Sequence, residues 1–184
     1  GSRTRQVTLK RLPLIGRDAE LATIREGLAA ARSRSGRLIE ITGEAGAGKT
    51  RLLEALRDEA TDFRQVHATC EAYTASTPYV VWREVLRELL QVAREDSDAV
   101  VADRLRAAVA TQMPELEPWL PLIAIASDVT MPMTPEVEML AEKNRRPKLH
   151  ETVSRFLSAM MPDPVLVEIE NAHHMDEPSA ELLA

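Results

Sequence analysis

Two short stretches of the sequence carry residue types that could do phosphate chemistry. The first is GEAGAGKT, residues 43–50, which matches the pattern G-x-x-x-x-G-K-[S/T] at every fixed position. Glycines allow successive backbone N–H groups to point inward around an anion, and a following helix adds the positive end of its dipole. Lys49 can then reach the β- and γ-phosphates, and the Thr50 hydroxyl can join the coordination shell of Mg²⁺. The pattern therefore predicts a site for a nucleotide phosphate chain.

The second stretch is VLVEIENAHHMDE, residues 165–177, an apolar run that ends in acidic residues and two histidines. A strand of this kind could hold the metal of a nucleotide-hydrolysing site. Here Glu170 is followed by Asn171 rather than by a second acid. An amide can orient a water molecule, but it cannot accept a proton as a carboxylate does, and losing a general base typically lowers a rate by about 10²–10⁴-fold. The stretch therefore predicts nucleotide binding with inefficient hydrolysis.

Glu168 adds a third polar group to this apolar run. Because side chains alternate along a strand, Glu168 and Glu170 share one face, about 6.6 Å apart along the strand at roughly 3.3 Å per residue. A carboxylate buried without a partner is costly, so we expect Glu168 to find a cation, take up a proton or lie near the opening of the site. Glu168 could also substitute for the missing acid, but its deeper position in the strand favours Glu170.

These residues need a scaffold, and the hydrophobic pattern predicts a parallel α/β sheet flanked by helices. Strands are expected at residues 37–42, 64–70 and 164–170. The glycine loop would follow the first strand, and Glu170 would end the third. Helices are expected from near Asp18 and over residues 50–60, 97–111 and 146–161. A further helix is predicted to begin with Thr77 as its N-cap and Pro78 at its first position.

Composition excludes several classes of function. The 184 residues carry a net charge of −6 without a continuous stripe of Lys and Arg, which argues against direct nucleic-acid binding. The single cysteine, Cys70, cannot form an internal disulfide, so a reducing compartment is expected. No apolar run approaches the roughly 20 residues of a membrane span, and the chain opens with no signal peptide. We therefore expect a cytoplasmic protein that makes no direct contact with nucleic acid or membrane.

The sequence resembles the STAND branch of the AAA+-related P-loop ATPases, modules found in large LuxR-type bacterial regulators and beside class III adenylyl cyclase domains. The glycine loop alone indicates only the superfamily. The Gly-Arg-x-x-Glu-Leu lead-in and the H-x-x-D-E-P-S ending narrow the resemblance. The segments that carry it are IGRDAEL (15–21), LIEITGEAGAGKTRLLEAL (38–56), TPYVVWREVL (77–86) and residues 165–183.

The resemblance implies ATP or ADP as the ligand and Mg²⁺ as the cofactor. Ile15, Gly16 and Arg17 would lie near the adenine and ribose. Lys49, Glu170 and Asn171 would form the catalytic set, with Thr50 and Glu170 on the metal side and Asn171 where the family usually has an aspartate. The remaining nucleotide contacts would come from Gly43, Glu44, Ala45, Gly46, Ala47, Gly48, Lys49, Thr50 and Arg51.

The expected organisation is a tag remnant and flexible segment over residues 1–13, followed by a P-loop NTPase domain over residues 14–184. A helical insertion at about 78–161 would separate the second strand from the metal-side strand. The resembled family has further strands, a lid and an arginine that acts on the γ-phosphate. Since this sequence has none of these, we expect a truncated domain with an unpaired sheet edge that invites self-association. Its other partners would be domains of a longer parent chain, such as a cyclase or a DNA-binding output domain.

Four functions fit these observations. The leading hypothesis is a regulatory switch that binds ATP or ADP and hydrolyses it weakly. The alternative is an active ATPase in which Asn171 or Glu168 suffices for hydrolysis and drives attached domains. A structural module without nucleotide binding is disfavoured because Lys49 and Thr50 are both present. A small-molecule kinase would need an acceptor site, which the sequence does not reveal.

The histidines favour structural interpretations. His173 and His174 with Asp176 and Glu177 could suggest a metal site, but adjacent residues on an extended chain point apart. Loop packing with Asp176 as a helix N-cap is the preferred interpretation. The isolated His67 and His150 are interpreted as surface or core residues.

Overall fold

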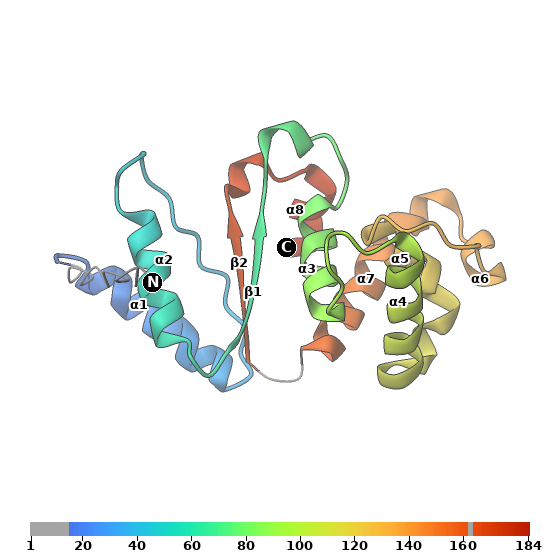
Figure 1. Ribbon diagram of the computed structural model, residues 1–184, viewed down its shortest axis with the longest axis horizontal. Helices are drawn as coiled ribbons and strands as arrows, with labels where there is room; N and C mark the ends of the chain where they lie inside the picture. The colour runs from blue at the N-terminus through green and yellow to red at the C-terminus, as the bar shows by residue number, and fades with distance from the viewer. Residues whose placement is uncertain (1–14, 162–163) are drawn as a thin grey trace, which may run out of the picture. The chain divides into compact units, whose positions relative to one another are not determined.

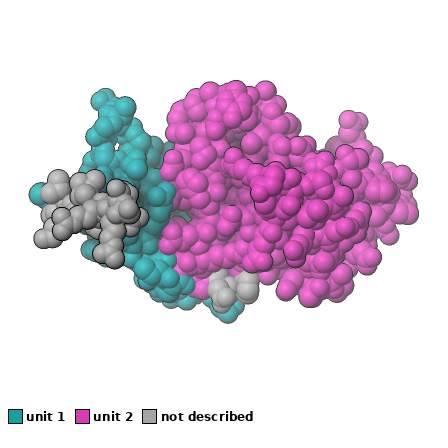
Figure 2. Space-filling view, in the orientation of Figure 1, with its two compact units in different colours: residues 1–62 teal, residues 63–184 magenta. Residues whose placement is uncertain are grey.

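The computed structural model describes residues 15–161 and 164–184, so the predicted flexible segment over residues 1–13 lies outside the described residues. The chain divides into two compact units, residues 1–62 (unit 1) and 63–184 (unit 2), coloured separately in Figure 2. The predicted glycine loop belongs to unit 1, and the predicted metal-side strand belongs to unit 2. The expected single domain over residues 14–184 stays a prediction.

Unit 1 is built on two packed helices, α1 (Asp18–Arg32) and α2 (Lys49–Glu59). Each helix repeats its apolar residues at a spacing of four, which places them on one face that can be buried. The buried residues are Ile24 and Leu28 on α1 and Leu52 and Leu56 on α2. Arg25 of α1 pairs with Glu59 of α2, and Arg32 pairs with Asp62, each at 2.7 Å. Both helices were predicted from this spacing.

The strand predicted over residues 37–42 is absent, which corrects the sequence interpretation. A strand forms through hydrogen bonds to a neighbouring strand. The described residues of unit 1 contain helices and no strand that could be such a neighbour. Leu38 is 74% exposed, so this segment is not the buried strand that its apolar residues suggested. The segment instead approaches α1 at Gly27, where an added Cβ would lie only 2.7 Å from the Cδ1 atom of Ile39.

Unit 2 contains a two-stranded parallel sheet of β1 (Arg64–Thr69) and β2 (Val165–Glu170), as Figure 1 shows. The register pairs Arg64 with Val165 at one end and Thr69 with Glu170 at the other. The prediction of an α/β chain with a parallel sheet is therefore confirmed, and the sheet is smaller than expected. Two of the three predicted strands are present.

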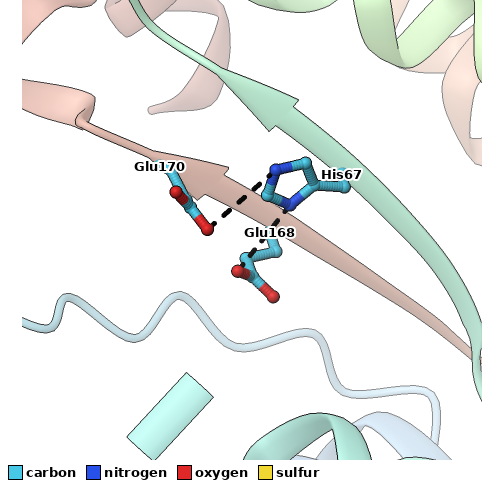
Figure 3. A group of neighbouring side chains, drawn as sticks. All are labelled: His67, Glu168 and Glu170. Carbon is cyan, nitrogen blue, oxygen red and sulfur yellow. Dashed lines mark ion pairs between the residues drawn. The ribbon is translucent and has the colours of Figure 1, made fainter. Parts of the chain in front are cut away.

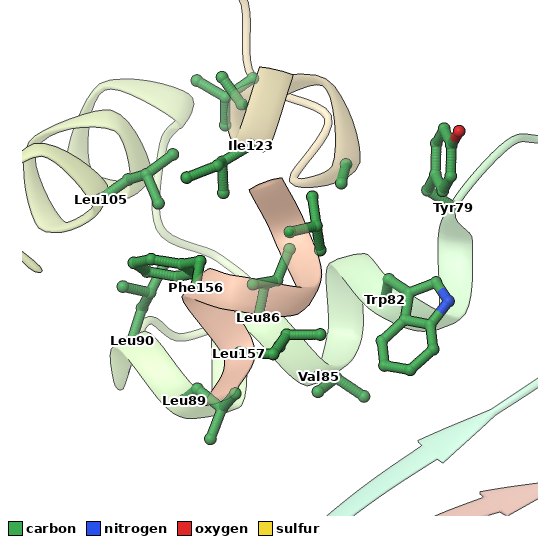
Figure 4. Close-up of a cluster of buried hydrophobic side chains, with 14 of the residues drawn as sticks. Tyr79, Trp82, Val85, Leu86, Leu89, Leu90, Leu105, Ile123, Phe156 and Leu157 are labelled. Atoms are coloured by element: carbon green, nitrogen blue, oxygen red, sulfur yellow. The ribbon is translucent and has the colours of Figure 1, made fainter. Parts of the chain in front are cut away.

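The helices between the two strands form most of unit 2. The helix α3 packs directly against β1, and α4, α5 and α7 pack around one another behind it. The largest buried side chains, including Leu86, Leu105, Ile123 and Phe156, form their shared core (Figure 4). The elements are η1 (Ala72–Thr74), α3 (Val80–Leu90), α4 (Asp98–Gln112), η2 (Pro114–Trp119), α5 (Leu120–Ala126), α6 (Pro135–Glu138) and α7 (Glu142–Met160), followed after β2 by η3 (Ala172–His174) and α8 (Glu177–Leu183). None of the helices in the described ranges is long and apolar enough to cross a membrane.

The start of α3 differs from the prediction. The helix begins at Val80, and its N-cap is Tyr79 in the left-handed region at φ 61°, not Thr77. The reason is a contact from far along the chain, because the backbone N–H of Tyr79 donates a hydrogen bond to Asp176 Oδ1 at 3.0 Å. A tertiary contact thus overrides the local Thr-Pro signal. The helix predicted over residues 146–161 also begins earlier, at Glu142.

Candidate functional site

The glycine loop of residues 43–50 has a backbone that requires glycine. Gly46 and Gly48 lie in the left-handed region, at φ +81° and +83°, a backbone conformation that residues other than glycine rarely adopt. A Cβ at Gly43 would lie 3.3 Å from the Cβ of Ala47, so the loop is tightly folded there. Gly48 is the N-cap residue of α2, and the helix begins at Lys49. The loop therefore brings backbone N–H groups and a helix N-terminus together, as an anion site needs.

Lys49 turns back over this loop. Its Nζ donates hydrogen bonds to the backbone carbonyls of Gly43 at 2.6 Å and Glu44 at 2.9 Å. A phosphate group would compete with these two carbonyls for the ammonium. Bonds between two charged groups are the stronger ones, so the exchange would favour the phosphate. Lys49 is thus held beside the loop in a position from which it can transfer its hydrogen bonds to an anion.

Arg17, the residue before α1, is hydrogen-bonded to the glycine loop. Its Nη2 donates to the backbone carbonyl of Ala47, and its Nη1 donates to Glu20 Oε1 at 2.7 Å. The hydrogen bond from Arg17 lowers the pKa of the Glu20 carboxyl below its usual value. Gly16 lies in the left-handed region at φ +73°, and Ile15 is 88% exposed. Of the three residues expected near the base, Arg17 is the one that contacts the loop.

A cavity of about 250 Å³ lies within unit 1 between these groups. Its walls include the cationic side chains of Arg17 and Lys49, the backbone of Gly48, and apolar side chains from both helices. The volume is slightly below the roughly 300–1,000 Å³ of typical ligand pockets, which suits part of a nucleotide. Thr50 is exposed in the first turn of α2, and Arg51 pairs with Glu54 at 3.5 Å. The exposed Glu44 and Ala45 form the outer part of the loop.

In unit 2, three side chains gather on one face of the sheet near the end of β2 (Figure 3). His67 on β1 stands between two carboxylates of β2: its Nδ1 lies 3.7 Å from Glu168 Oε1, and its Nε2 lies 4.0 Å from Glu170 Oε1. The Glu168 side chain is 7% exposed, whereas those of Glu170 and His67 are 39% and 50% exposed. Of the two acids, Glu170 is therefore the one that solvent reaches more easily. Glu168 was expected to find a cation, take up a proton or lie near the opening, and the structure places it beside the imidazole of His67.

Asn171 follows directly and has a structural role of its own. Its backbone is left-handed, at φ 54° and ψ 38°, and its carbonyl accepts a hydrogen bond from the N–H of His174 at 2.9 Å. Asparagine and aspartate are the residues other than glycine that tolerate this conformation best. The side chain is exposed at the end of β2. The turn therefore accepts Asn171 and would also accept an aspartate.

Asp176 closes the turn and confirms the predicted helix cap. Its Oδ1 accepts hydrogen bonds from the N–H of Ser179 at 2.9 Å and from the N–H of Tyr79 at 3.0 Å. One carboxylate oxygen thus caps α8 and holds the start of α3. The indole Nε1 of Trp82 donates to the carbonyl of Ser179 at 2.9 Å, which adds a second bond between the same two helices.

The remaining histidines are not part of the group formed by His67, Glu168 and Glu170. The rings of His173 and His174 lie 3.9 Å apart at a tilt of 46° in η3. The group of potential metal ligands found over residues 15–161 and 164–184 is that of His67, Glu168 and Glu170, and it does not include them. His150 lies 3.1 Å from the hydroxyl of Tyr79, and burial lowers its pKa.

His67 is the residue that sequence reasoning missed. Its position depends on the register, which sets His67 directly opposite Glu168. Alternation along each strand predicts which residues share a face, but it does not predict which residue of one strand pairs with which residue of the other. The only signal in the sequence was a histidine in the middle of a predicted strand.

Comparison with known proteins gives one match. A family model described as AAA ATPase domain matches residues 13–184, a range that contains both the glycine loop and the end of β2. A search of curated proteins and a search of solved structures each found no match.

Proposed function

Because the chain belongs to the AAA ATPase domain family, we propose that it is an ATP- or ADP-binding regulatory module whose hydrolysis is impaired. The family supports the binding of a nucleotide. The observation that carries the proposal is the glycine loop, in which left-handed glycines, the N-terminus of α2 and the ammonium of Lys49 converge beside one cavity. Positive charge beside a glycine-rich backbone at a helix N-terminus is what a phosphate site requires.

The residues of unit 1 would divide the work of binding. Backbone N–H groups of the loop would surround the phosphates, and Lys49 would exchange its two carbonyl partners for phosphate oxygens. Arg17, which already contacts the loop at Ala47, would hold the nucleoside end of the site in place. Mg²⁺ would supply neutralisation of the phosphate charge, and within unit 1 the Thr50 hydroxyl would help to hold it.

The impaired hydrolysis rests on Asn171. Its amide can position a water molecule by hydrogen bonding, but it has no basic oxygen that would take the proton of that water at neutral pH. Slow hydrolysis keeps the nucleotide bound for a long time, which fits a regulatory switch better than an ATPase that drives attached domains. The attached domains of a parent chain, such as a cyclase or DNA-binding domain, would then respond to whether ATP or ADP is bound, inside the cytoplasm.

An active ATPase is the second candidate, and Glu168 is the observation that favours it. Glu168 lies on the same face as Glu170 and could take over part of the role of a second acid. Its 7% exposure argues against this role, because an attacking water would need to reach it. The regulatory module is therefore preferred.

The deciding experiment is a single-turnover measurement with radiolabelled Mg²⁺-ATP and excess protein, with Lys49→Ala as the binding control. We expect the unaltered chain to retain ATP on a filter without cleaving it, and Lys49→Ala to retain far less. Cleavage at an ordinary ATPase rate of about 1 s⁻¹ or faster would contradict the impaired site and favour the second candidate. No retention, equal to that of Lys49→Ala, would contradict nucleotide binding itself.

A further inference from the structure

We propose that His67, Glu168 and Glu170 form a binding site for a first-row divalent transition ion, with Zn²⁺ as the reference case. One potential ligand atom from each residue lies within 4.8 Å of the other two. The site would be separate from the Mg²⁺ that accompanies a nucleotide, because it uses an imidazole nitrogen and needs no phosphate oxygen.

The parallel strand pair builds this cluster from its backbone. The register sets His67 opposite Glu168, and alternation brings Glu170, two residues further on, to the same face. Strand hydrogen bonds fix both backbones, so the three side chains start from a rigid base rather than from a loop. Figure 3 shows the ring of His67 projecting from β1 between the two carboxylates of β2.

The distances suit an ion better than a direct ion pair. His67 Nδ1 lies 3.7 Å from Glu168 Oε1, which is longer than a hydrogen bond, and one ligand atom from each of the three residues lies within 4.8 Å of the others. Zinc bonds of about 2.0–2.2 Å in tetrahedral geometry place ligand atoms roughly 3.3–3.6 Å apart. Small rotations of the side chains would reach this spacing without moving the strands.

Thr69 provides the orientation that a metal-binding histidine requires. Its hydroxyl lies 3.3 Å from His67 Nε2. A ligating histidine usually keeps a hydrogen bond on its second nitrogen, which fixes the ring and raises its basicity as a ligand. With Thr69 holding Nε2, the nitrogen that faces Glu168, Nδ1, is the one available to the ion.

The ligand set selects the class of ion. One imidazole and two carboxylates match zinc and its neighbours in the first transition row, whereas Mg²⁺ prefers oxygen ligands alone and keeps several waters. The half-exposed His67 and the 39% exposed Glu170 leave room for water to complete the coordination, while Glu168 lies deeper.

This inference does not depend on nucleotide binding. The test is therefore made without nucleotide: the chain is treated with EDTA, dialysed and titrated with ZnCl₂ in a calorimeter. Co²⁺ is added in a parallel experiment, because its visible absorption reports the ligand geometry. We expect one saturable site and a Co²⁺ spectrum of low coordination number.

The variants His67→Gln and Glu168→Gln are each expected to weaken zinc binding by at least about tenfold. His67 is half exposed, so His67→Gln is the variant that leaves the fold least disturbed, and circular dichroism checks both. The matched control is a double variant, His173→Gln with His174→Gln, which removes the other histidine pair and should bind zinc as the unaltered chain does. Absence of saturable binding, unchanged binding in His67→Gln, or loss of binding only in the double variant would each overturn the proposal.

Discussion

The glycine loop of unit 1 and the acidic end of β2 in unit 2 are assembled in opposite ways. The loop uses residues close in sequence: Lys49 bonds the carbonyls of Gly43 and Glu44, only five and six residues before it. The end of β2 uses residues far apart, because β1 supplies His67 from about a hundred residues earlier. The first site should therefore depend on local backbone conformation, and the second on the packing of the whole of unit 2.

The largest expected effect tests the chemistry at the end of β2. Asn171→Asp should raise the rate of ATP cleavage by about 10²–10⁴-fold, because it restores a proton acceptor in a turn whose left-handed backbone tolerates aspartate. Single-turnover hydrolysis measures it. Asn171→Gly, which suits the same backbone without offering a proton acceptor, is the control and should not raise the rate. An equal rise in both variants would attribute the effect to the turn rather than to the acid.

The next effect tests whether the end of β2 depends on distant packing. Asp176→Ala should lower the free energy of unfolding by about 2–4 kcal/mol, because it removes a helix cap and leaves the buried N–H of Tyr79 without its acceptor. Urea unfolding followed by tryptophan fluorescence reports it, since both tryptophans lie in unit 2. Asp176→Asn keeps an acceptor oxygen and should lose less. If the two variants lose equal stability, charge rather than hydrogen bonding holds the turn.

A smaller effect tests the glycine loop alone. Lys49→Ala should weaken ATP binding by about 10- to 100-fold, the equivalent of one hydrogen bond to a charged group at about 1.5–3 kcal/mol. Its unfolding transition should stay where it was, because the side chain bonds only loop carbonyls. Titration with a fluorescent ATP analogue gives the affinity. A shifted unfolding transition would show that the loop is less local than its contacts indicate.

The smallest effect separates backbone conformation from charge. Gly48→Ala should cost roughly 1–2 kcal/mol because its φ of +83° disfavours a side chain, which corresponds to about 5- to 30-fold weaker ATP binding. Gly36→Ala is the matched control, since an added Cβ there meets nothing within 4 Å. The same titration compares the two. Equal losses at both positions would contradict a specific requirement for the left-handed glycine.

The same contrast explains which features could be predicted from the sequence. Helices α1 and α2 follow from spacing and residue type within a few neighbours, so their prediction succeeded, whereas phosphate binding by the glycine loop stays a proposal. The AAA-type family was also accessible from short motifs, whereas the STAND branch and the regulatory role stay proposals.

The failures all involve partners that sequence spacing does not identify. Residues 37–42 have the composition of a strand but lack a neighbouring strand within unit 1, over the part of it that the structure describes. The start of α3 is set by Asp176, and the position of His67 is set by strand register. Each of these depends on a contact between segments that lie far apart along the chain.

The parallel pairing of β1 with β2 also sets an order of folding. The two strands can meet only by closing a loop of about a hundred residues, at an entropic cost on the order of 4 kcal/mol beyond the fixed term. The helices between the two strands contact segments that are closer to them in sequence. We therefore expect the helical core to form first and the strands to pair last. During synthesis at about 5–20 residues per second, β1 would be complete several seconds before β2 is made. Its unpaired backbone is then the segment most exposed to aggregation, which stopped-flow refolding with a β-sensitive dye would detect as a late phase.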